Sequence, residues 1–225
     1  MERFFNMDNK FFTFMGKVAD LMILNLLCLV CCIPVVTIGA SLTALFYVTL
    51  KMARNEESYI VRSFFRSFKE NLKQSLVINL IMLVTGLLLY LDLMISRGVE
   101  GTFGTVLMFV FTVILVIYLM LFMYIYPVLA KFYNSIKNTF TNAFLMSIRH
   151  LPYTLLMILV TAAPFLVFFI PSAQLQSFAL MFIVLLGCAT VAYVNSHFFV
   201  KIFDNYIPKE DEEQEKLTDE GEAIS

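Results

Sequence analysis

Residues 103–129 read FGTVLMFVFTVILVIYLMLFMYIYPVL, a stretch without a single charged side chain. A helix needs about 20 apolar residues to cross the hydrocarbon of a bilayer. A helix also satisfies its own backbone hydrogen bonds, which lipid cannot do. The stretch therefore predicts a transmembrane helix and places the chain among the integral membrane proteins.

Five further apolar stretches, at 18–36, 38–52, 75–95, 151–170 and 175–203, extend the prediction to six spans. The stretch 38–52 is short. It is either the second arm of a hairpin that turns at 34–41 or the end of one broken helix over 18–52. Of the 225 residues, 60% are hydrophobic and 15% charged, against about 25% charged in a soluble domain. We predict an all-α integral membrane protein, a six-span helical bundle with a short second span and two cytoplasmic amphipathic helices.

The distribution of Lys and Arg predicts the orientation, because cytoplasmic loops are enriched in these residues. With six spans and the N-terminus inside, fifteen of the sixteen basic residues lie in the cytoplasm, and only Arg97 lies outside. A five-span arrangement with the N-terminus outside places twelve inside. The apolar run 21–38 is longer than the core of a cleaved signal, so we expect it to be retained. The expected localisation is the cell membrane, multi-pass, with both termini cytoplasmic.

Two cytoplasmic segments, 58–73 and 132–149, have apolar residues at every fourth position and cations on the opposite face. Helices of this pattern lie in the headgroup region of a membrane or bind a partner. The alternative is that both apolar ridges cover the cytoplasmic end of the bundle. An offset of 76 residues superposes the two segments. The match indicates an internal repeat, or it arises by chance because the chain contains 24 phenylalanines. The candidate lipid or partner surface comprises Arg62, Phe64, Arg66, Phe68, Lys69, Lys73, Phe140, Phe144 and Arg149.

Polar residues within the predicted spans are costly unless they are satisfied. The candidate intramembrane contacts are Asp20, Asn25, Asn79, Asp92 and Asn195. Hydrogen bonds between helices explain them more simply than a substrate path does. Asp92 lies close enough in sequence to Arg97 for a local ion pair.

The sequence contains no motif that indicates catalysis. It has two histidines, no phosphate-binding glycine loop and no paired metal-binding histidines. Cys28, Cys31 and Cys32 form a Cys-x-x-Cys in mid-span, where a thiolate is disfavoured, so we interpret them as packing residues. We predict no enzyme activity, no catalytic, cofactor-binding or metal-binding residue, no cofactor and no nucleic-acid partner.

Charge also divides the chain, since residues 204–225 hold nine acids and two lysines while the remainder carries a net charge of +6. We predict a polytopic membrane domain over 1–205 and an acidic disordered cytoplasmic tail over 206–225, because this composition cannot bury enough apolar surface to fold.

Several blocks of sequence resemble the YesL-like family of bacterial membrane proteins. They are DLMILN at 20–25, IPVVTIG at 33–39, ALFY at 44–47, SFFRSFK at 63–69 and NAFLMSIRHLP at 142–152. The resemblance covers roughly residues 1–205. It implies a small multi-span protein of a family without an established activity, whose members are often encoded near carbohydrate uptake and breakdown systems.

The expected function is that of a non-enzymatic accessory or assembly component of a bacterial carbohydrate uptake system. The expected partners are the lipid bilayer and components of that system, and the sequence indicates no oligomeric state. The alternative is a small-solute transporter or channel in its own right. A weaker third hypothesis is an organiser of the lipid surface that acts through 58–73.

Overall fold

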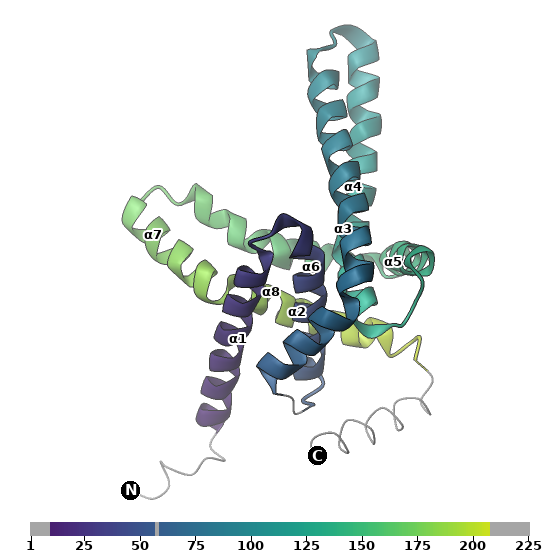
Figure 1. The fold of residues 1–225 in the computed structure, drawn as a ribbon. Coiled ribbons are helices and arrows are strands. Elements are labelled where there is room, and N and C mark those ends of the chain that lie inside the picture. Colours follow the sequence, from purple (N-terminus) through teal and green to yellow (C-terminus); the bar gives the residue numbers. More distant parts are fainter. Residues whose placement is uncertain (1–9, 57–58, 208–225) are drawn as a thin grey trace, which may run out of the picture.

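The computed structural model describes residues 10–56 and 59–207, and all the regular secondary structure of this part of the chain is helical (Figure 1). The α-helices are α1 (Lys10–Cys32), α2 (Ile38–Ala53), α3 (Ile60–Gly98), α4 (Gly101–Lys131), α5 (Ile136–Arg149), α6 (Leu151–Ala162), α7 (Ala173–Phe182) and α8 (Cys188–Phe203). Two 3₁₀ segments, η2 (Val35–Thr37) and η3 (Ala163–Phe169), and one π-helical segment, η4 (Ile183–Gly187), connect some of them. The predicted all-α fold is confirmed.

Six helical stretches of the described residues are long and apolar enough to cross a membrane. They are Phe11–Cys32, Val35–Ala53, Ile60–Gly98, Gly101–Lys131, Leu151–Phe169 and Ala173–Phe203. This number agrees with the six predicted spans and with a multi-pass membrane protein. The predicted tail falls largely on 208–225, outside the described residues.

The α1–α2 junction is a hairpin, which decides between the two alternatives for 38–52 (Figure 1). Proline ends the helical ladder because it has no N–H to donate. After Pro34 the chain makes the 3₁₀ turn η2, and the Thr37 hydroxyl donates to the carbonyls of Cys31 (2.7 Å) and Pro34 (2.8 Å). On the returning helix, the Ser41 hydroxyl donates to the carbonyl of Cys28 at 2.9 Å. The second span is therefore a separate helix, antiparallel to the first.

The first predicted amphipathic helix is not a separate element. Segments 58–73 and 75–95 join in α3, which runs without interruption from Ile60 to Gly98. Neither glycine nor proline occurs between Ile60 and Gly86, so nothing in that sequence breaks the helical ladder. In Figure 1, α3 and α4 form a long antiparallel hairpin whose far half extends beyond the other helices.

The second amphipathic segment does form its own helix, α5, because Pro152 at the start of α6 forces a new helical beginning after His150. The two halves of the proposed repeat therefore differ here. In the first half the amphipathic segment continues into its span, and in the second half the chain turns between them.

The core lies around α2, the most buried of the six candidate spans. On one side, Tyr124 of α4 packs edge-on against Phe199 of α8, with ring centroids 5.1 Å apart. On the other side, Leu45 of α2 packs with Leu24 of α1 and Phe64 of α3. The short second span is thus the centre of the bundle, whereas most of α4 exposes apolar side chains that suit lipid contact.

The predicted orientation can be tested with single cysteines in a variant whose four native cysteines are replaced. Thr141→Cys on α5 and Thr102→Cys at the start of α4 are both exposed positions. We expect a membrane-impermeant maleimide to label Thr102→Cys in intact cells, and Thr141→Cys only after permeabilisation. Labelling of Thr141→Cys in intact cells would show that the orientation is wrong.

Candidate functional site

Asn79 of α3 provides hydrogen-bond donors for two main-chain carbonyls of the turn between α1 and α2. Its amide nitrogen donates to the carbonyls of Val35 (3.0 Å) and Val36 (3.3 Å), and its amide oxygen accepts from the Tyr126 hydroxyl at 3.1 Å. The proline turn leaves carbonyls without helical partners, and each would be costly in an apolar setting. Asn79 thus joins three parts of the bundle and has no polar atom left over for a ligand.

Asn25 of α1 is completely buried and forms hydrogen bonds with two main-chain groups of the last span. Its amide nitrogen donates to the carbonyl of Val184 at 2.6 Å, and its amide oxygen accepts from the N–H of Ala189 at 2.9 Å. Val184 lies within η4 and Ala189 two residues after it, so Asn25 contacts the span where the wider π-helical turn meets α8. The side-chain amide therefore joins α1 to both a carbonyl and an N–H of the last span at this irregular turn.

The other predicted intramembrane residues make fewer contacts. Asn195 of α8 donates to the Thr161 hydroxyl at 3.0 Å, but its buried amide oxygen has no hydrogen-bond partner among the described residues. Asp20 and Asp92 are half-buried. The predicted Asp92–Arg97 pair is not among the ion pairs of the described residues, and residues five apart do not share a helix face.

The apolar ridge of the first amphipathic segment is packed inside the protein. Phe64 is fully buried in the cluster with α1 and α2, and Phe68 is half-buried against it. Of the interpretations that the sequence leaves open for this segment, the one in which the ridge covers the bundle is therefore supported, and insertion of Phe64 into lipid is not. Arg62, Lys69 and Lys73 remain exposed on the opposite face.

Helix α5 differs, since apolar side chains lie on both of its faces. Its buried face consists of Thr139, Ala143, Met146 and Ser147, and Phe140 is half-buried beside it. Phe144, Leu145 and Ile148 are exposed. We call these three residues the outer strip of α5.

A groove of about 530 Å³ runs beside the outer strip, lined by Phe132, Asn134, Asn142, Leu145, Met146, Ile148, Arg149 and Tyr206. The guanidinium of Arg149 lies 5.7 Å from the centre of the Tyr206 ring, and His150 Nε2 lies 3.2 Å from the Tyr206 hydroxyl. Burial, and then the neighbouring Arg149 charge, lower the pKa of His150. A neutral imidazole is therefore favoured at this edge of the groove.

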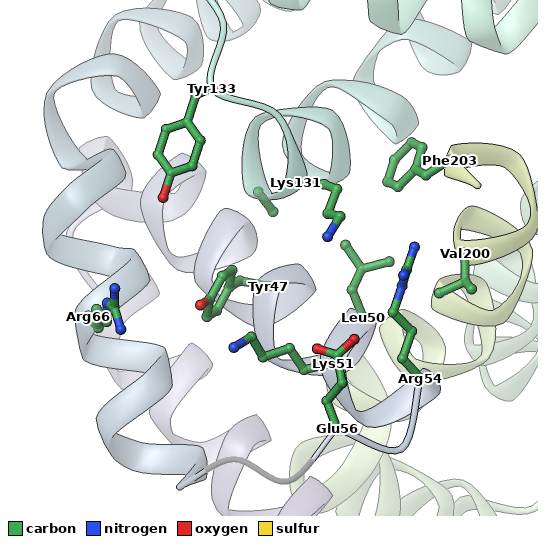
Figure 2. A pocket seen from close by; sticks show the side chains of 11 residues that line it. Tyr47, Leu50, Lys51, Arg54, Glu56, Arg66, Lys131, Tyr133, Val200 and Phe203 are labelled. Carbon is green, nitrogen blue, oxygen red and sulfur yellow. The ribbon is translucent and has the colours of Figure 1, made fainter. Parts of the chain in front are cut away.

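A second concavity of about 240 Å³ lies where α2, α4 and α8 end (Figure 2). Its lining includes four cations, Lys51, Arg54, Arg66 and Lys131, together with Glu56, Tyr47 and Tyr133. The Arg54 guanidinium forms an ion pair with the Asp204 carboxylate, and Arg66 Nε donates to Glu70 Oε1 at 3.1 Å. We call this concavity the basic pocket.

Of the basic pocket, the sequence-derived surface included only Arg66. Lys51 and Arg54 at the end of α2 and Lys131 at the end of α4 were missed because these helix ends meet only in the fold. One signal in the sequence pointed to Arg54 and Lys131. At an offset of 77 residues, Ala53-Arg54 superposes on Ala130-Lys131, and these are the corresponding helix ends of the proposed repeat.

Among the described residues, no group of three or more His, Cys, Asp or Glu side chains is arranged to hold a metal ion. Cys28 is buried in the core against α2, and Cys31 and Cys32 are half-buried beside it.

Comparison with known proteins gives two matches. Residues 21–93 match a family model described as "Protein of unknown function, DUF624". Over 150 residues the chain is 27% identical to "Uncharacterized protein YesL" of Bacillus subtilis (strain 168), which covers 66% of this chain and 70% of that protein. No solved structure matches. Neither description states an activity.

Proposed function

We propose, from its similarity to the YesL-like membrane proteins, that this chain is a non-enzymatic accessory or assembly component of a bacterial carbohydrate uptake system. In this role it binds a subunit of the uptake system through the outer strip of α5. The observation that carries the proposal is the exposure of Phe144, Leu145 and Ile148 on a helix that is not one of the candidate spans. Exposed apolar clusters outside the membrane are typical of protein interfaces.

The shape of the interface supports binding to a helix or an apolar loop. The lining of the groove combines the apolar Leu145, Met146 and Ile148 with polar residues and the cation Arg149. An apolar groove with a charged rim favours recognition of a partner helix. At the far tip of the α3–α4 hairpin the described chain forms only the short connection 99–100, which offers little surface to a partner.

The alternative, a transporter in its own right, has less support. Asn25 and Asn79 use their side-chain amides to join helices, and the Tyr124 hydroxyl lies 2.8 Å from that of Thr154 in the buried core. Polar groups used in this way hold a bundle together and do not line a path. The one observation that favours transport is the unsatisfied amide oxygen of Asn195.

The docking proposal predicts that Ile148→Ser lowers recovery of the uptake-system permease with the tagged chain by about tenfold, while the chain stays equally abundant. Loss of one well-packed apolar anchor costs on the order of 1.4 kcal/mol, which is a factor of ten in affinity. The measurement is quantitative mass spectrometry after gentle solubilisation of native membranes.

Val61→Ser is the matched control, because Val61 on α3 and Ile148 are both apolar and both 46% exposed. Equal permease recovery with Ile148→Ser and Val61→Ser would overturn the docking proposal. Transport of a sugar by the purified chain alone in proteoliposomes would establish the alternative.

A further inference from the structure

The basic pocket is formed by four helices that meet at one end of the bundle. Lys51 comes from the last turn of α2, Lys131 from the last turn of α4, Phe203 from the end of α8 and Arg66 from α3. In Figure 2, the Arg54 guanidinium and the Lys131 ammonium turn toward the same central space. Groups brought together from such distant parts of the sequence form a concave cationic surface that no single helix could provide.

The favourable interaction of cations with helix dipoles explains only some of the four cations in the basic pocket. Lys51 and Lys131 lie at helix C-termini, where a cation is favourable in any case. Arg66 is the seventh residue of α3, beyond the first helical turn, and pairs with Glu70 on the same helix. It adds a fourth cation to the lining of the pocket.

The remaining lining suits the organic part of an anionic molecule. The Lys51 ammonium lies 5.2 Å from the centre of the Tyr47 ring, and Tyr133, an exposed residue, also belongs to the lining. Leu50 and Phe203 add apolar surface. Tyrosines combine a hydroxyl hydrogen-bonding group with an apolar ring.

We propose that the basic pocket binds the phosphate group of a phosphate monoester. Arg54, which also pairs with Asp204, contributes a guanidinium charge, and Lys131 contributes a compact ammonium charge. A lipid headgroup such as phosphatidic acid and a soluble phosphorylated solute both carry this group. The site is separate from the outer strip of α5, so neither proposal depends on the other.

Glu56 gives the proposal a distinctive consequence. In Figure 2 its carboxylate points into the same space as the Lys131 ammonium. A bound phosphate would approach this like charge, so the intact carboxylate weakens binding. Removing its charge is therefore expected to tighten phosphate binding, whereas a purely structural role for these residues predicts no gain.

The test uses the full chain in phosphatidylcholine nanodiscs. Isothermal titration with glycerol 3-phosphate, with glycerol as the uncharged control, tests the soluble source, and native mass spectrometry with added phosphatidic acid tests the lipid source. We expect Lys131→Gln to weaken binding of at least one phosphate probe by about tenfold or more, and Glu56→Gln to strengthen it several-fold. Binding of only one probe identifies the source.

The matched control is Lys137→Gln, an exposed cation of α5 outside the pocket lining, which should leave binding unchanged. Arg66→Gln serves as a second variant if Lys131→Gln does not fold. The proposal is overturned if neither probe binds, if Lys137→Gln weakens binding as much as Lys131→Gln, or if Glu56→Gln weakens it too.

Discussion

Gly39→Val is expected to remove most of the folded protein, with a loss of about 3 kcal/mol or more in the free energy of unfolding. A Cβ atom at Gly39 would lie 2.8 Å from Asn79 Cβ, 2.9 Å from the Ser75 carbonyl oxygen and 3.1 Å from Tyr126 Cε1. The first two atoms belong to or adjoin the α3 backbone and cannot rotate away. Valine therefore forces α2 and α3 apart and breaks the Asn79 hydrogen bonds to the proline turn.

The measurement is the midpoint of thermal unfolding in mild detergent. After heating, the fraction of protein that still elutes from a size-exclusion column as a single species is recorded. Gly16→Val on α1 is the matched control, because a Cβ there meets nothing within 4 Å. We expect the control to unfold near the wild-type temperature. Similar midpoints for the two variants would contradict the close contact of α2 with α3.

Asn25→Leu is expected to cost about 2 to 4 kcal/mol in unfolding free energy, since it removes the buried hydrogen bonds of Asn25 with the Val184 carbonyl and the Ala189 N–H. Leucine has a similar volume, so the loss reports hydrogen bonding more than packing. The measurement is reversible denaturant unfolding in mixed micelles.

The control for this variant is Asn205→Leu. Asn205 is exposed, and its amide donates only to the nearby carbonyls of Lys201 and Ile202. A change within about 0.5 kcal/mol is expected there. If Asn25→Leu is equally mild, the α1 contact does not stabilise the last span.

The apolar stretches predicted the class of fold because the length and composition of a spanning helix follow directly from bilayer thickness. The interfaces were harder to predict. A ridge at every fourth position indicates that one face is apolar but does not tell protein from lipid, and Phe64 proved to face α1 and α2. The π-helical turn beside Asn25 has no signal of its own in the sequence, because it depends on a helix more than 150 residues away.

The basic pocket was predictable only in part, because tertiary contacts bring its residues together. Arg66 was visible as one of a row of cations, but Lys51, Arg54 and Lys131 each resemble an ordinary basic residue at the end of a span. Only the meeting of α2, α4 and α8 at one end makes them neighbours.

The continuity of α3 also has a mechanical consequence. At a rise of about 1.5 Å per residue, the helix extends about 26 Å from its contact with Gly39, near residue 77, to Ile60 and about 32 Å to Gly98. The part towards Ile60 is also held by Phe64, which is buried against α1 and α2. One continuous backbone therefore joins Arg66 at the basic pocket to the far tip of the α3–α4 hairpin.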